Sequence, residues 1–170
     1  MSKRIPWMFL LLWLVPLLAA AAGPQIVLRD FDGQPRDVGE YIGRGKWTVV
    51  AVWSADCPIC KREIHHMTFF HDEHKNKDAV VLGVSVDGYA NRGKAQGFID
   101  DHALNFPNLI GTREDASRFG GGPFIGTPTY YIFSPEGRYQ AKRVGAASQE
   151  EIEGIINRLN AERARNRKPG

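Results

Sequence analysis

Two long apolar segments dominate the pattern of hydrophobic and polar positions after residue 22. Residues 47–53 (WTVVAVW) and residues 79–86 (AVVLGVSV) carry few polar side chains, which is typical of strands covered on both faces in a parallel sheet. Between them, the chain from Pro58 to about Lys75 is expected to form a helix, because proline suits the first helical position. The order strand, helix, strand predicts an α/β fold.

Shorter elements are expected around this centre. Turn-forming glycines and prolines fill residues 30–46, and residues 89–111 are interpreted as an insertion after the second buried strand. The remaining pattern predicts helices at 92–103, at 113–119 and from Ser148 to about Arg165, and strands at 25–29, 106–110, 129–134 and 138–144. Together these elements indicate one domain over residues 23–170, with a mixed central β-sheet flanked by helices.

The first 22 residues differ from the rest of the chain. Lys3 and Arg4 precede an apolar run, and four alanines close the segment. A basic start, an apolar run and small residues at the end predict a cleaved secretory signal peptide. The alternative is a retained N-terminal membrane anchor, because residues 5–22 are at the lower limit of length for crossing a bilayer. Both interpretations place residues 23–170 outside the cytosol, in the periplasm or another extracytoplasmic space.

The net charge gives no sign of a nucleic-acid partner. The full chain carries +3, and loss of the first 22 residues removes Lys3 and Arg4 but no acid, which leaves +1. We therefore expect no nucleic-acid binding, and membrane association only if the N-terminal segment is retained. A basic cluster near the C-terminus predicts a solvated helix end, where cations suit the helix dipole: Arg158, Arg163, Arg165, Arg167 and Lys168.

Cys57 and Cys60 are the only cysteines, and they lie where the first buried strand gives way to its helix. A purely structural disulfide is disfavoured, because a loop this short restrains the unfolded chain little. At a helix N-terminus, backbone N–H groups and the helix dipole stabilise a thiolate and lower the pKa of the Cys57 thiol. Cys60, one turn later, is placed to close a disulfide and release a bound partner. The spacing therefore points to redox chemistry or metal binding.

With the segment Gly126-Thr127-Pro128-Thr129 about seventy residues after the cysteines, the chain resembles the thioredoxin superfamily. The N-terminal segment, the insertion at 89–111 and Glu63 resemble its exported TlpA/ResA-like branch. The resemblance covers roughly residues 25–160 and implies a thioredoxin-like fold. It also implies that Cys57 is the attacking thiol, that Cys60 is the resolving thiol, and that Pro128 follows a cis bond facing the pair. The backbone at Thr127 would then bind an extended substrate.

Two positions depart from the family pattern. Typical thioredoxins carry a buried acid six residues before the first cysteine, where this chain has Ala51. Glu63, at i+3 from the second cysteine on one helix face, is expected to replace it as a base, the alternative being a solvated helix acid. Asp56 stands where relatives carry an aromatic or apolar residue, and is expected to raise the pKa of the neighbouring thiol. Trp53 is expected to border the substrate site.

These features predict an exported thiol–disulfide oxidoreductase that exchanges dithiol for disulfide with other proteins. The TlpA/ResA-like resemblance implies a protein-disulfide reductase that receives electrons from a donor in the membrane. It further implies a role in cytochrome c maturation, copper-site assembly or general thiol repair. No cofactor and no metal site are expected.

Two alternative functions use the same cysteines. A copper carrier of this fold would hold Cu(I) with the two thiolates, because Cu(I) favours soft ligands. The histidines of the following helix add little, since only His71 and His74 share a face and no pair has the i, i+4 spacing of zinc helices. A thiol peroxidase is the second alternative. Ser54 stands three residues before Cys57, as in peroxiredoxins, but Val50 stands where those proteins carry a proline.

Overall fold

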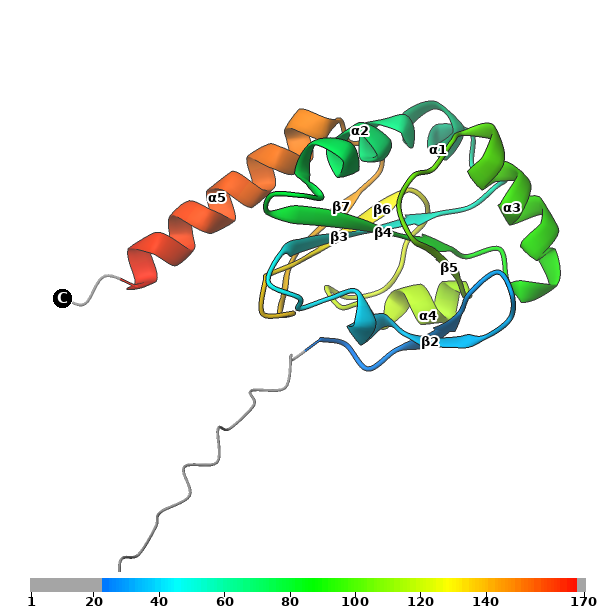
Figure 1. Ribbon diagram of the computed structural model, residues 1–170, viewed down its shortest axis with the longest axis horizontal. Coiled ribbons are helices and arrows are strands. Elements are labelled where there is room, and N and C mark those ends of the chain that lie inside the picture. The colour runs from blue at the N-terminus through cyan, green and yellow to red at the C-terminus, as the bar shows by residue number, and fades with distance from the viewer. Residues whose placement is uncertain (1–22, 168–170) are drawn as a thin grey trace, which may run out of the picture.

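A computed structural model describes residues 23–167 of the chain. Residues 1–22, for which a signal peptide is predicted, and residues 168–170 lie outside the described part. Seven strands form one sheet in the order β2-β1-β5-β4-β3-β6-β7, with helices packed on both of its faces (Figure 1). No helix within residues 23–167 combines the length and the apolar character needed to cross a bilayer.

The elements follow the predicted order with small changes at their ends. The strands are β1 (Val27–Arg29), β2 (Pro35–Asp37), β3 (Trp47–Trp53), β4 (Ala79–Ser85), β5 (Asn108–Ile110), β6 (Thr129–Phe133) and β7 (Tyr139–Val144). The α-helices are α1 (Pro58–Glu63), α2 (His65–His74), α3 (Arg92–Asp101), α4 (Arg113–Ser117) and α5 (Gln149–Arg167), with short 3-10 helices at Val38–Glu40 and Tyr89–Asn91. The predicted α/β fold with a mixed sheet is therefore confirmed.

Strand β3 lies at the centre of the sheet and is buried along its whole length. It pairs in parallel with β4 and in antiparallel with β6. Because successive side chains of a strand point to opposite faces, Val49 and Ala51 join the core beneath α1, α2, α3 and α5, whereas Val50 and Val52 join the core beneath α4. The apolar segment at 47–53 thus contributes side chains to two hydrophobic cores, one on each face of the sheet.

The predicted helix from Pro58 to Lys75 is divided at Ile64 into α1 and α2. Ile64 keeps right-handed helical dihedral angles, but the backbone N–H of Met67 bonds the Ile64 carbonyl, which is the tighter i to i+3 pattern of a 3-10 turn. Hydrophobic periodicity could not reveal the division, because the backbone stays helical on both sides of it.

Two other segments differ from their predictions. Residues 30–46, expected to be only turns, contain β2, which extends the sheet by pairing with β1 in antiparallel. Residues 89–111, interpreted as an insertion, contain α3 and also β5, which pairs in parallel with β4. The insertion is therefore an integral part of the sheet, since β5 connects β4 to β1.

The architecture brings the carboxyl ends of β3 and β4 to one edge of the sheet, because the two strands are parallel and in register from Trp47 and Ala79 to Trp53 and Ser85. The loops that leave these strands lie side by side at that edge. In open α/β sheets, such an edge is the usual place for a functional site. The cysteine pair follows β3 there.

The glycine at position 83 is required by close packing inside β4. A Cβ atom built on Gly83 would collide with the side chain of Asn108 and lie 2.9 Å from the ring of Phe106, whereas one built on Gly97 in α3 meets nothing within 4 Å. We expect Gly83→Ala to lower the free energy of unfolding by roughly 1–3 kcal/mol through overpacking. Gly97→Ala should raise the same free energy by roughly 0.5–1 kcal/mol, because alanine favours a helix.

Equilibrium urea unfolding of the two variants checks this expectation. Equal effects of the two substitutions would show that the packing around Gly83 yields easily, contrary to the tight contacts with Asn108 and Phe106.

Candidate functional site

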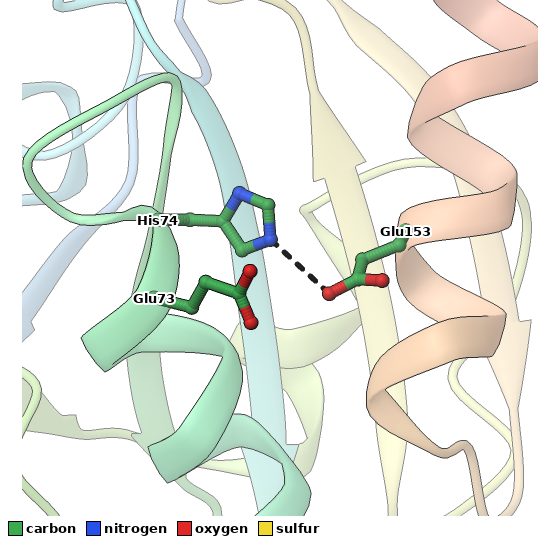
Figure 2. Close-up of side chains that lie close together, drawn as sticks. All are labelled: Glu73, His74 and Glu153. Carbon is green, nitrogen blue, oxygen red and sulfur yellow. Dashed lines mark hydrogen bonds and ion pairs between the residues drawn. The ribbon is translucent and has the colours of Figure 1, made fainter.

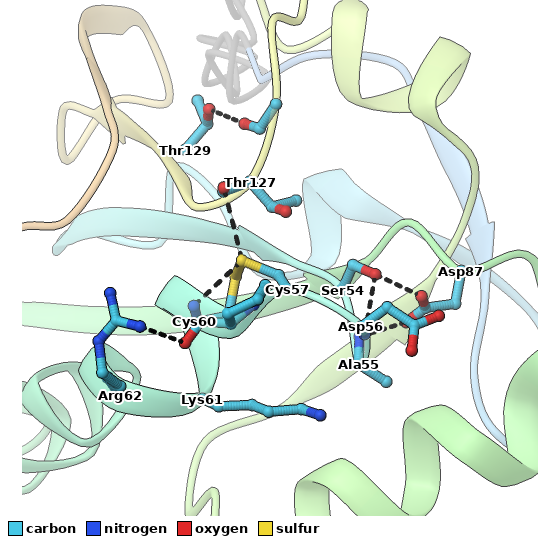
Figure 3. Close-up of a disulfide and its surroundings, with 12 residues drawn as sticks. Ser54, Ala55, Asp56, Cys57, Cys60, Lys61, Arg62, Asp87, Thr127 and Thr129 are labelled. Carbon is cyan, nitrogen blue, oxygen red and sulfur yellow. Dashed lines mark hydrogen bonds between the residues drawn. A yellow bond between two sulfur atoms is a disulfide. The ribbon is translucent and has the colours of Figure 1, made fainter.

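Cys57 is the N-cap residue of α1, and it forms a disulfide with Cys60 (Figure 3). The two Cα atoms are 5.2 Å apart, within the usual range for a disulfide. The backbone N–H of Cys60 donates to the Cys57 sulfur over 3.0 Å. Cys57 is 8% exposed and Cys60 1% exposed. Cys57 is therefore the more exposed of the two residues, and its sulfur accepts a hydrogen bond from a helix N–H.

The loop before β6 covers the cysteine pair from the other side of β3. The Thr127–Pro128 peptide bond is cis, which confirms the prediction made for it. The Thr127 carbonyl oxygen lies 3.5 Å from the Cys57 sulfur, and the Thr129 hydroxyl donates to the Gly126 carbonyl over 2.6 Å (Figure 3). The structure thus brings Thr127 and Pro128 to the cysteines, as the resemblance implied. Their contact with a substrate stays a prediction.

Trp53 does not lie on the surface of this site. Its side chain is 0% exposed, stacks on Phe98 of α3 with ring centroids 4.5 Å apart, and donates from Nε1 to Asn108 Oδ1 over 3.1 Å. The expectation that Trp53 borders the substrate site is corrected accordingly: its ring belongs to the core. The reason is the direction of the side chain, which points under α3 instead of outward from the end of β3.

Glu63 is the last residue of α1, and its side chain is partly buried. Its side chain is 28% exposed, with Oε2 3.6 Å from His66 Nε2. The pKa of Tyr130 is raised strongly, first by burial and then by the negative charge of Glu63. Tyr130 pairs with Ala51 across β6 and β3. Tyr130 therefore links the position at which typical thioredoxins place their acid to the electrostatic influence of Glu63. The role of Glu63 as a base stays a prediction.

The charge of Asp56 is directed away from the thiol toward a partner that the sequence did not reveal. The side chain is exposed and pairs with the Lys94 ammonium of α3. This hydrogen bond lowers the pKa of Asp56. Lys94 lies 38 positions along the chain, so no local pattern indicated the pair. The cation offsets part of the repulsion expected between Asp56 and a thiolate at Cys57.

Asp87 is the functional candidate that sequence reasoning missed. Its carboxylate accepts hydrogen bonds from the hydroxyl of Ser54 over 2.6 Å, from the backbone N–H of Ala55 over 2.9 Å, and from the hydroxyl of Ser85 over 2.7 Å (Figure 3). The sequence pattern predicts a buried strand up to Val86 and assigns no role to the acid that follows it. An acid just beyond the end of the neighbouring buried strand was the available signal, because parallel strands end at the same edge.

Comparison with known proteins places the chain in a family. The AhpC/TSA family matches residues 20–142. The chain belongs to the AhpC/TSA family. Thiol-disulfide oxidoreductase ResA of Oceanobacillus iheyensis is 30% identical over 116 residues, which cover 66% of this chain and 57% of the relative. ResA of Halalkalibacterium halodurans is 26% identical over 149 residues, covering 84% of this chain and 80% of the relative. The chain thus spans little more than half of the first of these relatives.

Solved structures agree on the fold of this AhpC/TSA-family chain. StoA from Bacillus subtilis has a TM-score of 0.61 at 20% identity, covering 79% of this chain and 98% of that one. A thiol:disulfide interchange protein of the thioredoxin family from Chlorobium tepidum has a TM-score of 0.66 at 20% identity, with 79% and 92% covered. The expected thioredoxin fold and the likeness to ResA-type proteins are therefore confirmed. The chain is a thioredoxin-fold redoxin with the CxxC pair of a thiol–disulfide oxidoreductase.

His71 of α2 forms a buried hydrogen bond to β4 in this family member. His71 is buried, and its Nδ1 accepts from the backbone N–H of Val81 over 3.1 Å. Burial, and then the charge of Lys75, lowers the pKa of His71. The shared helix face of His71 and His74 that the sequence suggested thus does not form a common site.

His74 instead holds the end of α2 against α5 (Figure 2). Its Nδ1 is 2.8 Å from Asp78 and its Nε2 is 3.2 Å from Glu153, while Gln149 donates to both Glu73 and Glu153 over 2.8 Å. Glu73, His74 and Glu153 have potential ligand atoms within 4.8 Å of one another. Because these atoms already bond one another and Gln149, we interpret the cluster as an ion-pair contact between two helices.

The His74 contact should make stability depend on pH. Burial opposes protonation of His74, but hydrogen bonds to Asp78 and Glu153 outweigh it and raise its pKa. A raised pKa means that the folded state binds the proton more tightly than the unfolded state. The contribution is therefore complete below the unfolded pKa of about 6.5, and it is lost as the pH rises through the folded value.

We expect His74→Ala to lower the free energy of unfolding by roughly 1 kcal/mol near pH 5.5 and by clearly less near pH 8.5. The exposed His65, replaced by alanine, is the matched control and should show a smaller dependence on pH. Urea unfolding at both pH values measures the difference. A deficit of His74→Ala that grows toward high pH would contradict the assignment.

Proposed function

We propose that the protein is an exported thiol–disulfide oxidoreductase that reduces disulfides in other proteins through Cys57 and Cys60. The observation that carries this proposal is the geometry of the pair. Cys57 caps α1, receives the Cys60 N–H at 3.0 Å, and lies 3.5 Å from the Thr127 carbonyl oxygen at the edge of the sheet. A sulfur in that position is suited to carry negative charge as a thiolate.

The proposed reaction is a two-step exchange. In the reduced protein, the Cys57 thiolate attacks one sulfur of a substrate disulfide, and the other substrate sulfur leaves as a thiolate that takes up a proton. Cys60 then loses its proton and attacks the Cys57 sulfur of the mixed disulfide. The substrate leaves as its second thiol, and the Cys57–Cys60 disulfide forms. Two electrons pass from the protein to the substrate, so an upstream dithiol donor must reduce the pair again.

The loop before β6 supports the substrate side of this proposal. A polypeptide joined to Cys57 has to pass the Thr127 carbonyl, because that oxygen is 3.5 Å from the sulfur. An extended substrate segment can therefore donate a backbone N–H to Thr127 in the manner of an added strand. Main-chain recognition of this kind tolerates many substrate sequences, which suits a protein that acts on several partners.

Export and the direction of electron flow are parts of the proposal that rest on the sequence. Residues 1–22 have the pattern of a signal peptide or anchor. The resemblance to TlpA/ResA-like proteins favours a reductant supplied by a membrane donor, in cytochrome c maturation, copper-site assembly or thiol repair. The related proteins of Oceanobacillus iheyensis and Halalkalibacterium halodurans are both named as thiol-disulfide oxidoreductases. A measured reduction potential separates a reductant from an oxidant.

The contacts of Ser54 argue for exchange over peroxidase chemistry. Alkyl hydroperoxide reductase C of Mycobacterium tuberculosis is 34% identical over 79 residues, 45% of this chain. Ser54 is the residue that matched the peroxidase pattern, but its hydroxyl donates to Asp87 over 2.6 Å. The hydroxyl is thus engaged in holding the loop.

Trapping of a mixed disulfide tests the order of the two cysteines. We expect Cys60→Ser to accumulate a covalent adduct with a disulfide-bonded protein substrate, because the resolving thiol is gone. Cys57→Ser should accumulate little, since its remaining thiol is 1% exposed in the parent structure. Intact-mass spectrometry under non-reducing conditions measures the adduct. Efficient trapping by Cys57→Ser and not by Cys60→Ser would reverse the assigned roles and overturn the proposal.

Glu63 is proposed to accept the proton of Cys60 during the second step. Cys60 is 1% exposed, and a buried thiol resists ionisation because its charged form loses solvation. We expect Glu63→Gln to slow release of the oxidised protein from the mixed disulfide by about tenfold or more, since general bases contribute on that order or above. The pH dependence of release should change as well, while the melting temperature stays close to that of the parent.

Glu162→Gln on the exposed end of α5 is the matched control for loss of one carboxylate. Stopped-flow measurement of substrate release at several pH values makes the comparison. If Glu63→Gln and Glu162→Gln have the same rate and the same pH profile, Glu63 is an ordinary solvated acid.

A further inference from the structure

The turn from Ser54 to Cys57 carries the reacting sulfur from the end of β3 to the start of α1. Ser54 accepts the hydrogen bonds that shape this turn. Its carbonyl accepts from the backbone N–H of Cys57 over 3.1 Å, and its hydroxyl oxygen accepts from the backbone N–H of Asp56 over 3.3 Å. The position of Ser54 therefore determines where Cys57 stands relative to the first N–H groups of the helix.

Asp87, which lies just after the neighbouring strand β4, accepts hydrogen bonds from this turn. One carboxylate oxygen accepts from the Ser54 hydroxyl over 2.6 Å, and the other accepts from the Ala55 N–H over 2.9 Å (Figure 3). The second oxygen also accepts from the Ser85 hydroxyl over 2.7 Å, which ties the carboxylate to the end of β4. Asp87 itself is secured, because its carbonyl accepts from the Asn91 side chain over 2.7 Å. Hydrogen bonds to an ionised acceptor are stronger than neutral ones.

We propose that Asp87 is a positioning residue for the nucleophile: its carboxylate anchors the turn at Ser54 and Ala55, and this anchoring keeps the Cys57 sulfur in line with the backbone N–H of Cys60. The inference rests on the proposed role of Cys57 as the attacking thiol. It adds a residue 30 positions away to that site and gives Ser54 a task unrelated to peroxide chemistry.

Anchoring and charge have opposite effects on the thiol, and this makes the proposal testable. As a nearby negative charge, Asp87 disfavours a thiolate, so its removal should lower the pKa of Cys57. As an anchor, it preserves the N-cap geometry that favours a thiolate, so its removal should raise that pKa. The other charged or titratable groups around the turn stay unchanged in both cases: Asp56, Lys61, Arg62, Glu63, Lys94, Asp101 and His102.

The experiment follows alkylation of the reduced full-length protein by iodoacetamide as a function of pH, with mass spectrometry locating the label. The variants are Asp87→Asn, which removes the charge and one acceptor, and Ser54→Ala, which removes a link without changing any charge. Asp32→Asn in the exposed β1–β2 turn and Ser117→Ala in α4 are matched controls. The melting temperature of each protein is measured alongside.

We expect the midpoint of the Cys57 alkylation profile to rise in both Asp87→Asn and Ser54→Ala. A rise of about half a pH unit corresponds to about threefold slower labelling below the midpoint. The controls should keep the midpoint of the parent. A midpoint at or below the parent value in either test variant overturns the proposal, and an unchanged midpoint with a lower melting temperature shows that Asp87 supports only the fold. Labelling of Cys60 before Cys57 in the parent would instead refute the proposed function.

Discussion

Burial of β3 on both faces is the constraint on which the rest of the structure depends. All seven residues from Trp47 to Trp53 are buried, so this strand has to lie between two layers of helices and between two neighbouring strands. Its parallel neighbour β4 brings a second carboxyl end to the same edge of the sheet. Its antiparallel neighbour β6 brings the loop at Thr127 to that edge from the other side. One central strand thus gathers three segments that are far apart in the sequence.

The chemistry of the cysteine pair follows from that gathering. Cys57 stands at the point where β3 becomes α1, and the backbone N–H of Cys60, in the first turn of the helix, donates to its sulfur. The core beneath α1 shields Cys60, which is 1% exposed, and leaves Cys57 slightly more accessible at 8%. This difference in exposure between the two cysteines supports the roles proposed for them, in which Cys57 meets the substrate and Cys60 closes the disulfide.

Three acidic residues of the segments around this pair have three different partners. Asp56, next to the nucleophile, pairs with Lys94, and Asp87, just after β4, binds the turn before the nucleophile. Glu63, at the end of α1, lies 3.6 Å from His66. Under the proposed function, Glu63 on the adjacent helix supplies the base that Ala51 in the strand cannot provide. The register of the two strands places Tyr130 of β6 opposite Ala51 of β3.

The sequence by itself determined the features that depend on local chemistry. Continuous apolar character located β3 and β4, Pro58 located the start of α1, and the Thr127–Pro128 bond is cis as expected from the matching segment. Only the tertiary structure decided the partners. A strand buried on both faces has no polar alternation to show where Trp53 points, and the hydrogen-bonded pairs of Asp56 with Lys94 and Ser54 with Asp87 join residues 38 and 33 positions apart. Burial and backbone preference are encoded residue by residue, whereas contacts between distant residues depend on how the strands align and how the helices pack across them.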